Sequence, residues 1–265
     1  MSKKQTIIFS NSYGPRTGHN FASDALKVFT NHQVLAHSRS ETRLSDFLKK
    51  YFEVAKTIYH KSDRDFFDSI IINDLRSNII KHSDSDYVMI KNTSFSGVKY
   101  LPEVFPDDIH VLILRNPVDS FSSAFKAMNL NKKGFKNKVK KMGKAIGVFP
   151  YYYFRKISNQ IIEVMPDLSK FYIIRYEDLV TQNETVLEAL KQKFNTPKSI
   201  QQIKEELNSI KVFNSSFFEE TGAKHIWDSK EKTTTFNPIG RKKHPFFIRK
   251  AIELAAKDLK NKLGY

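Results

Sequence analysis

The sequence has no cysteine among its 265 residues. Disulfide bonds, thiolate metal sites and cysteine nucleophiles are therefore excluded, and the absence is compatible with a reducing compartment. Any metal chemistry would have to use the eight histidines and the carboxylates.

Long apolar runs are also absent: nothing approaches the ~20 apolar residues of a membrane span, and Met1 to Thr6 is too polar for the core of a signal peptide. We therefore expect a cytoplasmic protein with no transmembrane segment.

Negative charge is scarce. The chain has 44 Lys and Arg against 28 Asp and Glu, which gives a formal net charge of +16. Such a chain attracts anions, whether a nucleotide, an acidic glycan, nucleic acid or a membrane surface. No nucleic-acid reader motif is present, so we expect no nucleic-acid partner. One basic stretch without an acidic residue is either a solvated surface or an anion-attracting rim; it comprises Lys132, Lys133, Lys136, Lys138, Lys140, Lys141 and Lys144.

Short apolar runs recur along the chain, with helical patterns between them. They are Thr6–Ser10, Val34–Ala36, Tyr87–Ile90, His110–Leu114 and Lys170–Ile174. Near-continuous apolar runs are typical of strands that are buried on both faces of a parallel sheet. We therefore predict an α/β fold, a single domain over residues 1–265, in which helices flank a central parallel sheet.

Two later helices are predicted from one-sided apolar spacing. Thr181 and Glu184 fit a capping box at the start of the first helix. The stripes, which we assign to the core and not to chemistry, are Val186, Leu187, Leu190 and Phe194 in one helix and Ile248, Ile252, Ala255, Leu259 and Leu263 in the other.

A glycine-rich loop, Gly14 to Gly18, follows the first predicted strand and precedes a predicted helix. The first N–H groups of a helix lack intrahelical partners, and together with the helix dipole they can bind a phosphate. The loop is P-loop-like but is not a Walker A motif, because His19 and Asn20 stand where that motif has Lys and Ser or Thr. ATP or GTP hydrolysis is therefore disfavoured, and an ordinary glycine turn is the alternative.

A second anion-binding pattern follows the run Val111–Leu114. Arg115 stands at the strand's end, Pro117 suits the first turn of a helix, and Ser123 lies further along that helix. Arg115 and Ser123 can hold one phosphate together. The alternative is that Arg115 caps a sheet edge and that Ser123 is an ordinary helix serine.

Taken in order, Pro15–Phe21, Arg115–Asp119 with Ser123, and Arg175–Leu179 resemble the sulfotransferase superfamily, in particular its bacterial and carbohydrate-modifying members. The resemblance implies that the chain binds 3′-phosphoadenosine 5′-phosphosulfate. Tyr176 would lie near the adenine, whereas Glu177 and Asp178 are interpreted as structural because carboxylates would repel the phosphates. The implied ligands of the 5′-phosphosulfate are Arg16, Thr17, Gly18, His19 and Asn20, and those of the 3′-phosphate are Arg115 and Ser123.

Two segments near the end of the chain are also similar to the family. Pro238–Lys242, with Gly240 and Arg241, resembles the element that closes over the 3′-phosphate, and Lys262–Tyr265 resembles the family's ending. The stretch from Ser40 to Asp86 and the lysine-rich stretch match no family motif. We expect acceptor specificity to lie there.

Sulfonate transfer is an in-line displacement in which the bridging oxygen of the phosphosulfate gains negative charge. We assign Arg16 to stabilise that oxygen, and the resemblance implies no metal. Small-molecule members have a Lys-Thr-His element where this chain has Lys91-Asn92-Thr93. Asn and Thr side chains cannot act as bases at neutral pH, so we predict that His37, which follows the second strand, is the general base, with His19 and Lys91 as rivals.

The predicted function is transfer of a sulfonate group to a hydroxyl or amine of a carbohydrate. The candidate partner, which would accept the sulfonate, is an acidic glycan. A lipid or a small alcohol is the alternative acceptor. A nucleotide-dependent kinase would need a Lys-Ser/Thr pair in the loop and acidic metal ligands, and neither is visible. A non-catalytic binder of acidic polymers would use the net charge of +16, but the intact phosphate motifs argue against it.

Overall fold

The computed structural model describes residues 5–35, 42–128, 143, 146–211 and 244–265. These residues contain a five-stranded sheet with the strand order β2-β3-β1-β4-β5, and every neighbouring pair is parallel. The strands are β1 (Thr6–Ser12), β2 (Gln33–Val34), β3 (Tyr87–Asn92), β4 (Ile109–Leu114) and β5 (Tyr172–Arg175). The predicted α/β class and parallel sheet are confirmed. β5 begins later than predicted because residues 168–170 form a 3-10 turn, η2.

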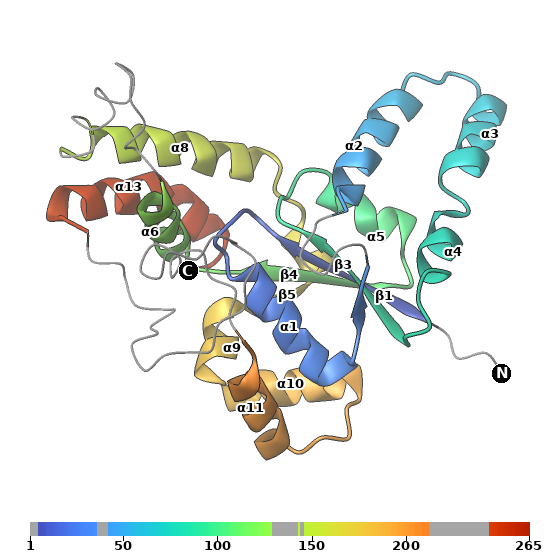
Figure 1. Ribbon diagram of the computed structural model, residues 1–265. Coiled ribbons are helices and arrows are strands. Elements are labelled where there is room, and N and C mark those ends of the chain that lie inside the picture. Colours follow the sequence, from blue (N-terminus) through green and yellow to red (C-terminus); the bar gives the residue numbers. More distant parts are fainter. Residues whose placement is uncertain (1–4, 36–41, 129–142, 144–145, 212–243) are drawn as a thin grey trace.

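Helices cover both faces of the sheet (Figure 1). On one face lie α1 (His19–Thr30), α9 (Tyr176–Thr181), α10 (Glu184–Phe194) and α11 (Ile200–Ser209). On the other lie α2 (Leu44–Ala55), α4 (Leu75–Ile80), α5 (Leu101–Val104), α6 (Pro117–Ala127), α8 (Val148–Glu163) and α13 (Phe246–Lys262). The remaining described elements are α3 (Lys61–Ile71) and the 3-10 turn η1 (Val98–Tyr100).

The strands alternate their side chains between two apolar cores. Ile8 and Met89 point into the core beneath α1 and α10, whereas Ile7 and Phe9 point into the core beneath α8 and α13. Successive side chains of a strand face opposite sides, so both sets of strand residues must be apolar. This burial on two faces explains the near-continuous apolar runs in the sequence.

The predicted apolar stripe of α10 is confirmed at Leu187, Leu190 and Phe194, which are buried. The capping box predicted from Thr181 and Glu184 is wrong. Asn183 is the N-cap, since its side chain accepts from the backbone N–H groups of residues 185 and 186 at 3.1 and 3.4 Å. Thr181 still belongs to α9, where its hydroxyl donates to the Glu177 carbonyl at 3.0 Å. The stripe of the last helix is confirmed at Ile248, Ile252, Ala255, Leu259 and Leu263.

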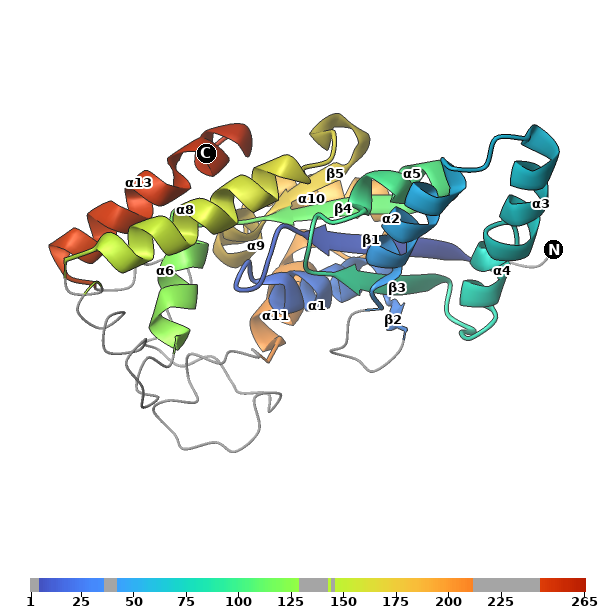
Figure 2. The ribbon, with the colours of Figure 1, turned by 90° about the horizontal axis from the view of Figure 1, so that it is seen from above.

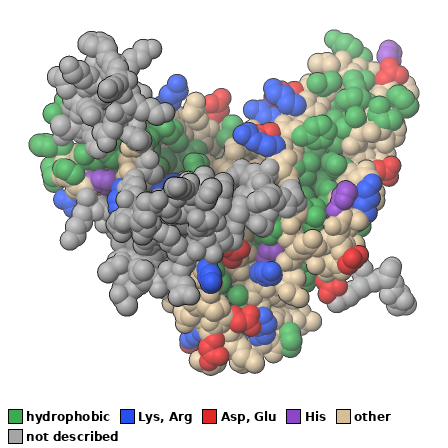
Figure 3. Space-filling view, viewed as in Figure 1, with side chains coloured by type: hydrophobic (Ala, Val, Ile, Leu, Met, Phe, Trp, Pro, Cys, Tyr) green, Lys and Arg blue, Asp and Glu red, His purple; other side chains and the backbone are tan. Residues whose placement is uncertain are grey.

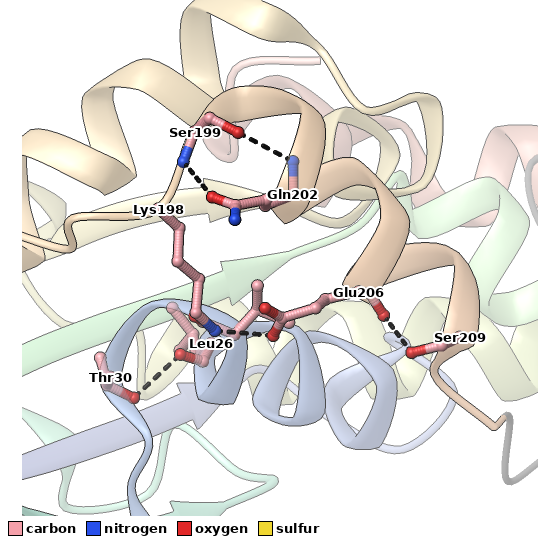
Figure 4. Close-up of polar contacts among 8 residues, drawn as sticks. Leu26, Thr30, Lys198, Ser199, Gln202, Glu206 and Ser209 are labelled. Carbon is pink, nitrogen blue, oxygen red and sulfur yellow. Dashed lines mark hydrogen bonds and ion pairs between the residues drawn. The ribbon is translucent and has the colours of Figure 1, made fainter.

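The start of α11 holds the far end of α1 in place (Figure 4). A capping box joins Ser199 and Gln202. The preceding Lys198 donates to the Val28 carbonyl at 2.8 Å and to Glu206 at 2.6 Å. α1 is therefore fixed at its C-terminal end by polar contacts and along its length by the core.

Helices α2 and α3 project from the sheet at the opposite end from α8 and α13 (Figure 2). α3 has no buried residue, and the side chains of Phe66 and Ile70 are 66% and 60% exposed. Figure 3 shows apolar side chains gathered over this pair of helices.

Below them, α4 is tied to the sheet by Arg76, which pairs at 2.8 Å with the fully buried carboxylate of Asp108. No helix within the described part of the chain is long and apolar enough to cross a membrane.

Candidate functional site

The loop between β1 and α1 is closed by its own contacts. Thr17 is buried, and its hydroxyl donates to the Gly14 carbonyl at 3.0 Å. Gly18 has φ 79°, and a Cβ atom there would come within 2.2 Å of the ring of Tyr176. Both the left-handed backbone and the close ring require glycine. The loop backbone therefore packs directly against the Tyr176 ring, with no room for a side chain between them.

Arg16 also has a left-handed backbone, with φ 71°, a conformation that costs a non-glycine residue roughly 1–3 kcal/mol. Its carbonyl accepts a hydrogen bond of 2.9 Å from the guanidinium of Arg115, which lies 99 positions further along the chain. Because Arg115 holds this strained position from the neighbouring strand, the first predicted phosphate motif depends on the second.

α1 begins at His19, and no acidic residue lies in its first turn. His19 is buried, and its Nε2 lies 2.9 Å from both the carbonyl and the hydroxyl of Ser10 on β1. Burial, and to a smaller extent the charge of Lys91, lower the pKa of His19 to about 3. The imidazole is therefore neutral at physiological pH and is a weak base, which counts against its role as the rival to His37.

Lys91 approaches the same helix end from β3. It is 3% exposed, and its Nζ donates to the side-chain carbonyl of Asn20 at 2.6 Å. The parallel register places Lys91 directly beside Ser10. A cation therefore stands at the first turn of α1. From the sequence, Lys91 is a candidate only as a base. Its hydrogen bond with Asn20 depends on the register between β3 and β1, which the sequence does not show.

The second motif forms the corner between β4 and α6. Pro117 is the first residue of α6 as predicted, and the Asn116 side chain caps the helix by accepting from the Val118 N–H at 3.0 Å. Arg115 and Ser123 are 9% and 6% exposed. The guanidinium of Arg115 lies 4.7 Å from the centre of the Tyr176 ring, a cation–π distance.

Tyr176 joins the two motifs. Its ring lies against Gly18, and the guanidinium of Arg115 lies over the ring. Burial raises the pKa of the Tyr176 hydroxyl to about 12, although the charge of Arg115 opposes that rise. The structure thus brings together Arg16, Thr17, Gly18, His19, Asn20, Arg115 and Tyr176 at the carboxyl edge of the sheet, the edge where α/β proteins bind ligands.

Glu177, which we interpreted as structural, has protein donors on both of its carboxylate oxygens. The Asn116 N–H donates to one at 2.8 Å, and the Tyr265 hydroxyl donates to the other at 2.9 Å. The sequence interpretation gave Tyr265 no role beyond its family-like ending. Its contact with Glu177 joins residues 88 positions apart, and no local pattern reports such a contact.

Several predicted features fall outside the described residues, namely His37, Gly240, Arg241 and the lysine-rich stretch. β2 ends at Val34, before the predicted base.

In the part of the chain that the structure describes, no group of three or more His, Asp or Glu side chains could hold a metal ion. A cavity of about 480 Å³ beside β2 shares no residue with the phosphate motifs; it is lined by Gln33, Val34, Leu35, Thr42, Leu44, Asn78, Ile79, His82 and Ile90.

The family model described as "Sulfotransferase family" matches residues 15–199 of this chain. The comparison with curated protein sequences finds no match.

Among solved structures, a sulfotransferase domain from the curacin biosynthetic pathway is 16% identical, with 97% of this chain and 98% of that chain covered and a TM-score of 0.47. Mouse sulfotransferase SULT7A1 complexed with PAP is 13% identical (99% and 90% covered, TM-score 0.42). Retinol dehydratase in complex with androsterone and PAP is 15% identical (98% and 81% covered, TM-score 0.42).

Proposed function

The chain belongs to the sulfotransferase family, and we propose that it transfers the sulfonate group of 3′-phosphoadenosine 5′-phosphosulfate to a hydroxyl or amine of a carbohydrate. The observation that carries this proposal is the contact of Arg115 and Tyr176 with the loop at Arg16 and Gly18. Two anion-binding motifs, far apart in the sequence, support each other at one edge of the sheet. A nucleotide with two separate phosphate groups is the kind of ligand that such a pair would hold.

The residues present fit this donor. Arg115 presents a nearly buried guanidinium at the end of β4, with Ser123 on the adjoining α6, and these would hold the 3′-phosphate. The 5′ side would be held by Arg16, Asn20 and the first N–H groups of α1. Thr17 and His19 already direct side-chain atoms at Gly14 and Ser10. They would therefore contribute through their backbone N–H groups.

When bound, the nucleotide supplies an activated sulfonate, and the chain's own groups lower the barrier by position and charge. We assign Arg16 to donate to the oxygen on which negative charge grows. Lys91, buried beside Asn20 at the first turn of α1, adds positive charge to the same end of the helix. Tyr176 would lie beside the adenine, and Gly240 and Arg241, which lie outside the described residues, would close over the 3′-phosphate.

The acceptor must lose a proton, and we assign its removal to His37. The other candidates are less suited: His19, whose pKa is lowered to about 3, is a weak base, and Lys91 donates to Asn20. An unperturbed histidine, with a pKa of about 6.5, is largely neutral at pH 7 and can accept a proton.

A carbohydrate acceptor is supported by the net charge of +16 and by the departure from the small-molecule element at Asn92 and Thr93. The Asn92 amide donates to the Ser45 hydroxyl at 2.6 Å and to the Ser94 carbonyl at 3.1 Å. It therefore serves to fix the end of β3 against α2. A lipid or a small alcohol is the alternative acceptor.

The test is a screen with ³⁵S-labelled 3′-phosphoadenosine 5′-phosphosulfate against neutral glycans, acidic glycans, lipids and small alcohols. Wild type is compared with Arg16→Ala in every arm, and ³²P-labelled ATP replaces the donor in a parallel arm. Sulfonate transfer to a glycan, reduced in Arg16→Ala, is the expected result. Label on a lipid or small alcohol alone would overturn the carbohydrate assignment, and phosphate transfer from ATP would overturn the donor assignment.

A further inference from the structure

Three consecutive residues at the end of β5 reach three different parts of the protein. The Arg175 guanidinium donates to the Gly264 carbonyl at 3.1 Å and lies 4.4 Å from the centre of the Tyr265 ring. Tyr176 contacts the phosphate loop and Arg115, as described above. Glu177 joins Asn116 to Tyr265. The turn that follows α13 is thereby connected to the corner that carries Arg115.

The position of Tyr265 is set by the way α13 ends. Gly264 has φ 71°, the N–H of Tyr265 donates to the Lys260 carbonyl, and the N–H of Gly264 donates to the Asn261 carbonyl, both at 3.1 Å. These two bonds form a Schellman motif, which glycine permits because it adopts the left-handed conformation without strain. The Tyr265 side chain is thus held over β5 by the helix end and by Arg175.

The Tyr265 hydroxyl acts as a donor. Burial, and then the negative charge of Glu177, raise the pKa of this hydroxyl, so it keeps its proton at all ordinary pH values. Its bond to one oxygen of Glu177 complements the bond from the Asn116 N–H to the other. Charge-assisted bonds of this kind are stronger than neutral ones. Together they fix the direction of the carboxylate.

That direction matters because Arg115 precedes Asn116 directly. Glu177 and Arg115 both act electrostatically on Tyr176 and on Tyr13, so both charges lie near the same two rings. Without the Tyr265 hydroxyl, one carboxylate oxygen of Glu177 would lose its donor. The carboxylate would then hold the Asn116 N–H, and with it the backbone next to Arg115, less firmly.

We propose that Tyr265 is a positioning residue for the 3′-phosphate half of the nucleotide site, acting through Glu177 and the backbone of Asn116 on Arg115. The proposal rests on the proposed function, because it assumes that Arg115 binds the 3′-phosphate. The role is indirect, because the Tyr265 side chain contacts Glu177 and Arg175 and not the residues assigned to the phosphates.

The experiment measures the dissociation constants of adenosine 3′,5′-bisphosphate and of AMP by calorimetry. The ratio of the two constants reports the contribution of the 3′-phosphate. Tyr265→Phe keeps the ring over Arg175 and removes the hydroxyl, which donates to Glu177 and also interacts with the Arg175 side chain. Asp258→Asn is the matched control: Asp258 lies on α13, the helix that leads to Tyr265, and the substitution breaks its 2.7 Å ion pair with Arg155 of α8 without touching Glu177.

Tyr265→Phe is expected to weaken bisphosphate binding about threefold to tenfold, less than the loss of a direct hydrogen bond to a charged group because Tyr265 acts through Glu177, and to leave AMP binding unchanged. Asp258→Asn should leave the ratio unchanged even where it lowers the melting temperature. Adding Glu177→Gln, which removes the charge through which Tyr265 acts on Asn116, should suppress the effect of Tyr265→Phe. If wild type prefers the bisphosphate and Tyr265→Phe prefers it equally, the inference alone fails. If wild type binds both nucleotides equally, the proposed function fails and the inference falls with it.

Discussion

Gly18→Ala is the substitution whose effect can be worked out most fully from the structure. The added Cβ would lie 2.2 Å from two carbons of the Tyr176 ring, whereas carbon atoms pack at about 3.5–4.0 Å. The ring would have to retreat, and it carries Arg115 on its face. We expect roughly 1–2 kcal/mol from the left-handed backbone and roughly 1–3 kcal/mol from overpacking. The free energy of unfolding should therefore fall by roughly 2–5 kcal/mol.

The assays are urea unfolding and thermal melting, in which a loss of that size lowers Tm by roughly 4–20 °C. Gly14→Ala is the control in the same loop, because a Cβ there meets nothing within 4 Å and the residue has no left-handed backbone. It should change the free energy of unfolding by less than about 0.5 kcal/mol. Equal effects of the two substitutions would refute the argument.

A double-mutant cycle separates the two causes of the Gly18→Ala effect. In a Tyr176→Ala background the steric clash is gone, so Gly18→Ala should cost only the roughly 1–2 kcal/mol of backbone strain. The full cost in that background would show that Tyr176 is not the obstacle.

Three further predictions concern ligands and pH. Arg115→Ala and Ser123→Ala should mainly raise the dissociation constant of adenosine 3′,5′-bisphosphate, whereas Arg16→Ala should lower kcat more than it weakens binding; a change confined to KM in Arg16→Ala would contradict its catalytic role. The pKa of His19 is lowered to about 3 on folding, so its neutral form stabilises the fold above pH 6.5 and that contribution is lost as the pH falls towards 3. Between pH 7 and 5, wild type should lose about 2 kcal/mol more stability than His19→Gln, and parallel pH profiles in urea unfolding would count against this. Reversing Lys138, Lys140 and Lys141 to Glu should leave bisphosphate affinity unchanged and weaken only long acidic acceptors, in a manner that fades with salt; a large loss of bisphosphate affinity would place those lysines over the nucleotide.

The sheet and the start of α6 could be predicted because their signals are local. Strands buried on both faces must be apolar at every position, and Pro117 after Asn116 marks a helix start that no later contact alters. Thr181 failed as a cap because α9 runs through it before Asn183 begins the next helix. Nothing in the local sequence showed where the preceding helix would stop.

The order of the phosphate motifs could be read from the sequence, but the contacts that join them could not. The Tyr176 ring between Gly18 and Arg115, the inward bonds of His19 to Ser10 and the link from Tyr265 to Glu177 all depend on strand register and helix packing. A sequence pattern names the residue types at these positions. Only the fold determines whether a side chain there faces a ligand or the protein.

The central claim is that the two phosphate motifs hold the two phosphate groups of one nucleotide. Calorimetric titration of the wild-type protein with adenosine 3′,5′-bisphosphate and with AMP tests it most directly, with Arg115→Ala titrated in parallel. A charge-assisted contact to the extra phosphate should make the bisphosphate bind about tenfold tighter or more, and Arg115→Ala should abolish that preference. Equal affinities of the wild-type protein for the two nucleotides would contradict the account.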